Sequence, residues 1–356
     1  MPISAVDAIS PAFEHTKQQL FKPFRFGQWT RLAFVGLLAG ELGSGGGCNL
    51  PRNFPTRPNS TQHFIDTGLA ATNPALLAAL IAVLVVSGLV LGIFLLYASS
   101  VMRFVLFDSV LAKECKIREG WTQRQAPGTK YFLWKLLYML LMIAATVVVI
   151  GIPLGFGFAI GWLRDPSHHI VPLVLAGIVL FFVVLLFFVT SAVIYVLTKD
   201  FVVPQMAFEN ITAIEGWRRL WIMIQAEKGG YAGYVGMKIV MAIGAAIVLG
   251  IVSVIVVVAI AIPVGALGLA AVLTGKAAGL TWNLQTITLA VVVGSVVLAF
   301  FFYILSLIAV PAIVFFPAYS IYFFASRYPR LGSVLYPAPP SPPQASFSPP
   351  STEPIG

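Results

Sequence analysis

Residues 200–228 read DFVVPQMAFENITAIEGWRRLWIMIQAEK and lie between two long apolar runs that contain almost no charge. Glu215 precedes Arg219 by four residues, in the direction that favours an ion pair along a helix. Such a segment is typical of an amphipathic helix at a membrane surface, here one that links two membrane spans. Its apolar face, read at helical spacing, consists of Ile214, Trp217, Trp221 and Ile224.

The composition of the whole chain supports this interpretation. Of the 356 residues, 59% are hydrophobic and only 10% are charged, and the mean hydropathy is +0.93. A soluble domain carries about 25% charged residues, so this chain has too few of them to cover a wet surface. The net charge of +9 could indicate nucleic-acid binding. Because basic residues of membrane proteins gather in cytoplasmic loops, we expect no nucleic-acid partner.

The apolar runs predict an all-α fold, a polytopic transmembrane helical bundle of about six spans. The first run is the weakest, because Glu41 interrupts it and it ends in glycines, so it is either a short span or a re-entrant segment. An N-terminal interfacial helix at residues 1–28 precedes the membrane domain at 29–330, and the Pro-rich tail at 331–356 is expected to be disordered. The spans are expected near residues 30–47, 75–99, 131–162, 170–197, 231–273 and 284–324.

The 22 Lys and Arg residues are distributed unevenly among the loops. The loops on one predicted side hold only Arg52, Arg57, Arg164 and Lys276, and the other basic residues fall on the opposite side. Cytoplasmic loops are enriched in Lys and Arg. We therefore expect both termini in the cytoplasm, in a multi-pass membrane protein.

An internal repeat is a further hypothesis. Residues 103–121 (RFVLFDSVLAKECKIREGW) and 200–217 (DFVVPQMAFENITAIEGW) align at a Phe-Val start and a Glu-Gly-Trp end with a gap of one residue. Each unit would be a two-span hairpin that ends in a cytoplasmic interfacial helix, and residues 310–324 are a candidate third copy. The alternative is that short apolar and charged segments look alike by chance.

The same segments carry a resemblance to a known family. FKPFRFGQWTRLAF at 21–34, RFVLFDSVL at 103–111 and FVVPQMAFENITAIEGWRRLWIMI at 201–224 resemble an uncharacterised bacterial polytopic membrane family. That family is related to the membrane domain found beside some glycerophosphodiester phosphodiesterases. The resemblance implies a six-span, multi-pass domain of unknown role in a bacterial cytoplasmic (inner) membrane. No segment here is polar or long enough to be the catalytic barrel, so the phosphodiesterase activity is not expected.

No constellation of residues predicts a reaction, and we expect no enzyme, no catalytic residue and no cofactor. His168 and His169 are adjacent and have no further ligand in register, so we expect no metal site. The candidate contact residues lie instead on the two amphipathic segments, where they would touch membrane lipids, a protein partner or a second copy of the chain. They are Glu215, Trp217, Arg218, Arg219, Trp221, Arg118 and Trp121.

The apolar runs themselves contain few charges. The predicted second to sixth spans have no ionisable residue in their central parts, and Lys135 and Lys238 fall near their ends. Glu41 is the credible intramembrane charge, and such residues are functional by default. The leading hypothesis is a non-enzymatic scaffold, anchor or assembly factor. The alternative is a transporter or lipid-handling protein for an apolar or amphiphilic substrate, which a lateral opening would favour and a solid apolar core would oppose.

Overall fold

The computed structural model describes residues 3–41, 74–163, 166–279 and 284–337, and within these ranges the regular structure is helical throughout, as predicted. The first half of the chain forms α1 (Ile9–Phe21), α2 (Phe26–Ala39), α4 (Pro74–Leu111), α5 (Ile117–Gln123), α6 (Gln125–Thr146), η1 (Val147–Gly151) and α7 (Ile152–Ala159). The second half forms η2 (Pro166–His168), α8 (Ile170–Leu197), η3 (Thr198–Val202), α9 (Val203–Glu209), α10 (Ala213–Ala226), α11 (Lys228–Ala277), α12 (Leu284–Ala325) and α13 (Pro329–Leu335). The segments η1 and η3 are π-helical.

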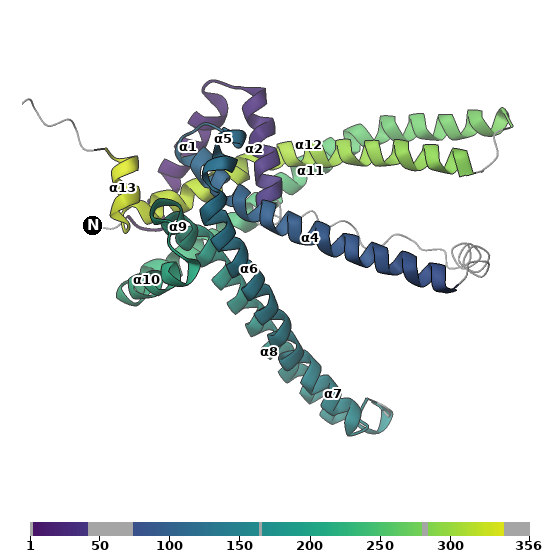
Figure 1. Cartoon of the computed structure of the whole chain (residues 1–356), viewed down its shortest axis with the longest axis horizontal. Helices are drawn as coiled ribbons and strands as arrows, with labels where there is room; N and C mark the ends of the chain where they lie inside the picture. The colour runs from purple at the N-terminus through teal and green to yellow at the C-terminus, as the bar shows by residue number, and fades with distance from the viewer. Residues whose placement is uncertain (1–2, 42–73, 164–165, 280–283, 338–356) are drawn as a thin grey trace, which may run out of the picture.

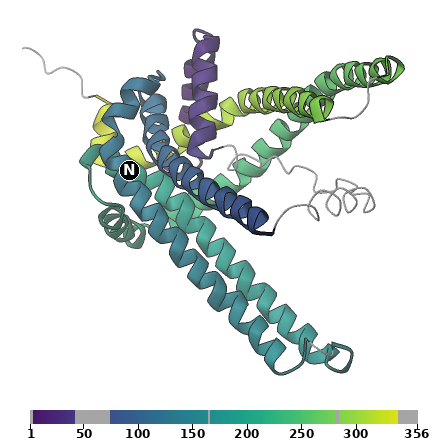
Figure 2. The ribbon, with the colours of Figure 1, turned by 45° about the vertical axis from the view of Figure 1, so that its right-hand side comes forward.

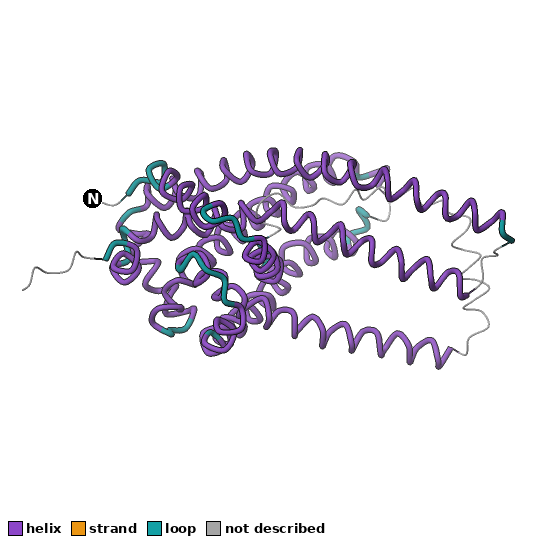
Figure 3. The backbone as a smooth tube through the Cα atoms, turned by 90° about the horizontal axis from the view of Figure 1, so that it is seen from above, coloured by secondary structure: helices purple, strands orange, loops and turns teal. Residues whose placement is uncertain are grey.

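The long helices spread outward from one end of the molecule, which we call the base (Figure 1). At the base, α1, α2, α5, α9, α10 and α13 surround the inner ends of α4, α6, α8, α11 and α12 (Figures 1 and 3). Among the described elements, α4 extends from the base without a helix beside it, α6 and α7 run beside α8, and α11 runs beside α12 (Figures 1 and 2). The outer ends of these arms lie apart from one another.

The described part of the chain contains five helical segments that are long and apolar enough to cross a membrane. They are Leu77–Leu111, Gln125–Ala159, Ile170–Glu209, Lys228–Ala277 and Gln285–Ala325. The apolar side chains of the arms are exposed along most of their length. A helix that is apolar all round satisfies its own backbone hydrogen bonds, so it does not need a neighbouring helix when lipid surrounds it.

The predicted first span, at residues 30–47, is not confirmed, so the described ranges contain five of the six expected spans. The helix α2 has 14 residues, which is about 21 Å at 1.5 Å per residue, whereas a hydrocarbon core is about 30 Å thick. It ends because Gly40 adopts a left-handed conformation (φ +79°). Residues 42–47 lie outside the described ranges. Within those ranges, α2 is a helix of the base that packs against α4 and α12.

The C-terminal boundary also differs from the prediction. Disorder was expected from residue 331, but α13 continues to Leu335 and the Leu331 side chain is fully buried. The apolar spacing of Leu331 and Leu335 lets a short helix close the base after α12. Residues 338–356, the Pro-rich remainder of the predicted tail, lie outside the described ranges.

The buried core is concentrated in the base. Aromatic rings from η3, α11 and α12 contact one another at its centre, where Tyr234 stacks on Tyr319 at a centroid distance of 5.0 Å. Phe201 lies 4.9 Å from Tyr234 and 5.1 Å from Phe324. Aromatic pairs in such geometries stabilise a core beyond the area that they bury. The base is therefore a packed unit that holds the inner ends of the arms in position.

Candidate functional site

Five charged side chains meet at the base, where α2, α4, η3 and α11 come together. We call them the ion cluster, and they are Glu41, Arg103, Lys199, Asp200 and Lys238. Their exposed fractions range from 2% for Asp200 to 8% for Lys238. Charges at such burial are expensive unless they are paired and hydrogen-bonded, so their partners decide what the cluster can do.

The local structure explains how these residues reach one place. Glu41 follows the left-handed Gly40, which turns the chain away from the end of α2. Lys199 and Asp200 lie in η3, where the backbone is π-helical. A π-helical turn contains an extra residue, which changes the direction of the side chains that follow, and such turns are frequent at functional sites. This turn places two oppositely charged neighbours at the centre of the base.

Glu41 is the link between three elements. Its Oε1 accepts a hydrogen bond from Arg103 Nη1, and its Oε2 accepts one from Lys199 Nζ. Arg103 Nη2 in turn donates to the carbonyl oxygen of Ala39 and, over 3.3 Å, to the hydroxyl of Tyr195. Both carboxylate oxygens of Glu41 therefore face cations, and Arg103 also holds the end of α2.

Asp200 forms the second half of the cluster. Its Oδ2 accepts hydrogen bonds from Lys238 Nζ and from the hydroxyl of Tyr234, the latter over 2.9 Å. The Lys238 ammonium also lies 5.8 Å from the ring centroid of Tyr234 and 6.0 Å from that of Phe316, within the range of cation–π attraction. The cluster thus contains three cations and two carboxylates, which leaves one positive charge in excess when all five groups are ionised.

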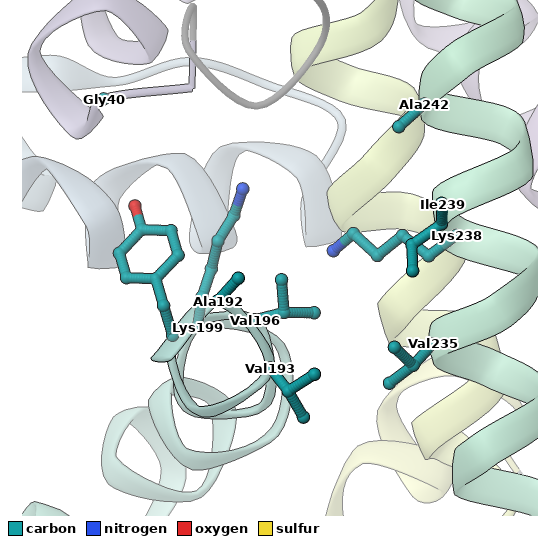
Figure 4. A pocket seen from close by; sticks show the side chains of 10 residues that line it. Gly40, Ala192, Val193, Val196, Lys199, Val235, Lys238, Ile239 and Ala242 are labelled. Atoms are coloured by element: carbon teal, nitrogen blue, oxygen red, sulfur yellow. The ribbon is translucent and has the colours of Figure 1, made fainter. Parts of the chain in front are cut away.

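A cavity of about 460 Å³ lies beside the cluster, between α8 with η3 on one side and α11 on the other (Figure 4). Pockets that bind small molecules are typically about 300–1,000 Å³, mostly apolar, with a few polar groups. The ammonium ends of Lys199 and Lys238 extend into the space between the two walls (Figure 4). Its lining consists of Gly40, Ala192, Val193, Tyr195, Val196, Lys199, Val235, Lys238, Ile239 and Ala242.

The structure places the predicted contact residues of α10 outside this cavity. The expected ion pair is present, because Arg219 Nε donates to Glu215 Oε1 over 3.0 Å. This hydrogen bond lowers the pKa of the Glu215 carboxyl. Arg219 Nη1 also donates to Glu209 Oε2 over 2.6 Å, which ties α10 to α9. Arg218 contacts Glu215 as well, but its side chain is 74% exposed.

The apolar face of α10 is divided between the core and the surface. Trp217 is half-buried, and its Nε1 donates to Thr198 Oγ1 over 3.0 Å, so this indole is part of the packing on η3. Trp221 is 56% exposed and Ile214 is 67% exposed. The helix itself begins where the Thr212 hydroxyl accepts from the backbone N–H of Glu215, as in a capping box.

The two remaining predicted contact residues, Arg118 and Trp121, belong to α5. Trp121 packs against Tyr97 of α4 with the rings edge to face at 6.1 Å. The helix α5 contacts α4, whereas α10 contacts η3 and α9. The predicted residues therefore lie on two separate helices and do not converge on the ion cluster.

Sequence reasoning found Glu41 and missed its partners. Lys199 and Asp200 were assigned to a loop after the fourth span, and Arg103 to the loop after the second. The available signal was that Arg103 and Lys238 interrupt or border long apolar helices, where a charge needs a partner. Within the described ranges, no three His, Cys, Asp or Glu side chains come close enough to hold a metal ion.

These features define the class of the protein. An all-helical chain with five helices able to cross a membrane, and with paired charges buried where those helices meet, is a multi-pass membrane protein. The chain belongs to the family of unknown function DUF7544, which matches residues 3–334. No curated protein and no solved structure matches it. The expected relation to the membrane domain of glycerophosphodiester phosphodiesterases is not confirmed by these comparisons.

Proposed function

We propose that this protein binds an amphiphilic membrane molecule, such as a lipid, between α8 and α11 and handles it without a covalent reaction. The observation that carries this proposal is the cavity itself, because two buried lysines project from walls that are otherwise mostly apolar. A molecule with a polar head and an apolar body matches such a lining. The walls are also accessible from the surrounding membrane, since Ile239 is 54% exposed.

The spread of the arms supports handling of a lipid over a purely structural role. A solid core of Leu, Val and Phe between the spans would leave no path for an amphiphile. Here the outer parts of α4, α8 and α12 lie apart, and their apolar side chains are exposed (Figures 1 and 2). Lipid chains can therefore lie against the arms up to the base, where the cavity begins.

The test is photocrosslinking of a phospholipid that carries a photoactivatable acyl chain to the full chain in lipid nanodiscs. Ala242 lines the cavity, so Ala242→Trp should fill it and reduce labelling of peptides from α8 and α11 severalfold. Ala259→Trp, on the exposed side of the same helix, is the matched control and should label like the native protein. Equal labelling of both variants would contradict the proposal.

A scaffold or assembly role is the second candidate, and the exposed edge of α10 favours it. Ile214, Arg218 and Trp221 form an apolar and basic edge that can meet anionic lipid, a protein partner or a second copy of the chain. Arg218→Glu reverses a charge that is 74% exposed and should leave the fold intact. If this role holds, the variant should lose copurifying partners or anionic lipid in mild detergent, and an unchanged set would oppose it.

We also propose that the base faces the cytoplasm of a bacterial cell. The basic residues concentrate there, and the two described ends of the chain meet at the base, where Arg327 Nη1 donates to the carbonyl oxygen of Ile3 over 3.0 Å. In a Cys48→Ser, Cys115→Ser background, Lys116→Cys at the base and Ser167→Cys at the outer end should be labelled from opposite sides by an impermeant maleimide. Labelling from one side would overturn this topology.

The repeat hypothesis gains support from two matching glycine contacts. A Cβ on Gly120 would lie 3.2 Å from the Val105 side chain, and a Cβ on Gly216 would lie 2.7 Å from that of Val202. In the alignment of residues 103–121 with 200–217, these two glycines and these two valines occupy equivalent positions. We propose that α4 with α5, and α8, η3 and α9 with α10, are copies of one unit, a long helical segment followed by a short helix whose glycine packs against a valine of that segment.

A further inference from the structure

We infer that the cavity between α8 and α11 is a headgroup site for an anionic phospholipid, in which Lys238 and Lys199 hold a singly charged phosphate diester. This inference rests on the proposed function and adds the charge of the ligand and the groups that recognise it. The proposed function does not by itself specify the charge of the amphiphile. The specificity follows from the charge balance of the ion cluster and from the direction of its hydrogen-bond donors.

The charge balance comes first. Glu41 is shared by Arg103 and Lys199, whereas Asp200 has one cationic partner, Lys238. Among the described residues, two carboxylates therefore face three cations, all of them buried. Buried charges are costly unless they are balanced, and a monoanion in the adjoining cavity would balance the net positive charge of these five described groups. A neutral or zwitterionic headgroup brings no net charge and would leave the excess in place.

The hydrogen-bond donors of the two lysines also favour an anionic ligand. A lysine ammonium has three N–H donors, and Asp200 takes one of those of Lys238. The Lys238 ammonium extends from α11 across the cavity toward the wall that carries Lys199 (Figure 4). A phosphate between the two ammonium groups would receive charge-assisted hydrogen bonds, which are roughly twice as strong as neutral ones.

Tyr195 supplies a third donor in the same lining. Its hydroxyl oxygen accepts a hydrogen bond from Arg103 Nη2 over 3.3 Å, which directs the hydroxyl proton away from the guanidinium. The proton is then suitably placed to bond a second phosphate oxygen. Because Arg103 also contacts Glu41, occupation of the cavity would be transmitted directly to the pair that holds the end of α2.

The apolar part of the ligand is accommodated by the rest of the lining. Val193, Val196, Val235 and Ile239 flank the lysines, and their helices continue outward as exposed apolar surfaces. The headgroup would therefore lie toward the base and the acyl chains along the arms. A free phosphate ion would use the same donors but would gain nothing from these walls, so the test must separate the two sources.

The experiment measures retained lipid by native mass spectrometry, with the full chain exchanged into equal mixtures of phosphatidylglycerol and phosphatidylcholine. We expect the native protein to retain phosphatidylglycerol preferentially. Lys238→Gln should lower this preference roughly tenfold, the effect of losing one charged hydrogen bond. Lys228→Gln removes the same charge from the same helix outside the cavity and should change nothing.

The variant Asp200→Asn distinguishes recognition of the lipid headgroup from a purely structural role of the ion cluster. It also keeps the test decisive if Lys238→Gln does not fold. It removes the carboxylate that competes for Lys238, so the preference for phosphatidylglycerol should rise. The double variant Asp200→Asn, Lys238→Gln removes both charges of the pair and should retain no more phosphatidylglycerol than Lys238→Gln does. If Lys238→Gln fails to fold, the double variant should retain less phosphatidylglycerol than the native protein. A structural cluster alone predicts equal or weaker lipid retention in Asp200→Asn.

The remaining outcomes separate this inference from the proposed function. If the native protein retains both lipids equally while Ala242→Trp retains less of each, the charge specificity is wrong and lipid handling stands. If Ala242→Trp retains both lipids like the native protein, lipid handling itself is wrong. If millimolar inorganic phosphate displaces phosphatidylglycerol from the detergent-solubilised protein, the ligand is a soluble phosphate and the lipid assignment is overturned.

Discussion

Glu41 and Lys199 are 158 positions apart in the chain, yet the carboxylate of one accepts a hydrogen bond from the ammonium of the other in the buried centre of the base. This contact joins the end of α2 to η3, and Arg103 joins the same carboxylate to α4. Elements from three distant parts of the chain therefore depend on a single side chain. Its removal should have consequences for the whole base.

Glu41→Gln should destabilise the protein strongly. Arg103 and Lys199 would remain buried and would lose their carboxylate, and breaking a buried ion pair typically costs about 3–5 kcal/mol. The thermal midpoint in detergent, followed by circular dichroism, should fall clearly below that of the native protein. Glu114→Gln alters a carboxylate that is 62% exposed and serves as the control. Equal midpoints for both variants would contradict a central role for Glu41.

The glycine contacts predict a graded effect of added methyl groups. Gly216→Ala would place a Cβ 2.7 Å from Val202 Cγ1, whereas Gly120→Ala would place one 3.2 Å from the Val105 side chain. Overpacking costs about 1–3 kcal/mol, so the first variant should be less stable than the second. Val202→Ala should partly restore Gly216→Ala, because it removes the methyl group that clashes.

The control for these variants is Gly236→Ala on α11, where a Cβ would meet no described atom within 4 Å. That change should be neutral or stabilising, because glycine inside a helix costs roughly 0.5–1 kcal/mol relative to alanine. Chemical unfolding in mixed micelles compares all the variants. A failure of Val202→Ala to rescue Gly216→Ala would show that the contact does not limit the packing of α10 on η3.

Stability should decrease in mild acid because of His15. Its Nε2 donates to the carbonyl oxygen of Val110 over 2.8 Å, and its Nδ1 accepts from the Tyr322 hydroxyl over 3.2 Å. Burial is the main cause that lowers the pKa of His15 in the folded state, and the charge of Lys113 adds to it. The unfolded chain therefore binds a proton more readily, so stability is complete above about pH 6.5 and declines as the pH falls below that value.

The measurement for His15 is the thermal midpoint at pH 7.5 and at pH 5.5. His15→Gln keeps an amide that can bond the Val110 carbonyl but cannot be protonated, so its midpoint should change less between the two pH values. A native protein whose midpoint is the same at both values would exclude this contribution. A decline of equal size in both proteins would assign the acid sensitivity to other groups.

Cys115 should react slowly with maleimides while the protein is folded. The thiol is 4% exposed, and burial raises its pKa, so both access and thiolate content are low. Labelling of a Cys48→Ser variant should become fast only after denaturation. Lys116→Cys in a background without the native cysteines provides an exposed thiol one position away and should label within minutes. Rapid labelling of folded Cys115 would contradict the burial of the segment between α4 and α5 in the base.

The predictions that rest on local sequence pattern are confirmed for features that form within a single helix. The helix α10 forms where the amphipathic spacing predicts it, and its Glu215–Arg219 pair follows from a separation of four residues. Five of the expected spans are present as long apolar helices for the same reason. The expected first span is not confirmed, because α2 ends at Gly40 and hydropathy does not determine where a left-handed glycine stops a helix.

The sequence by itself determined that this chain is helical, that its long helices suit a membrane and that α10 is amphipathic, because these properties depend on residues within one or two helical turns. Only the tertiary structure decided that Glu41, Arg103, Lys199, Asp200 and Lys238 form one cluster beside a cavity. The physical reason is that a buried charge is costly unless it has an oppositely charged partner, whereas tertiary packing decides which distant residue becomes that partner. Thus the sequence singled out Glu41 as an unusual charge, and the packing of four elements made it part of a candidate binding site.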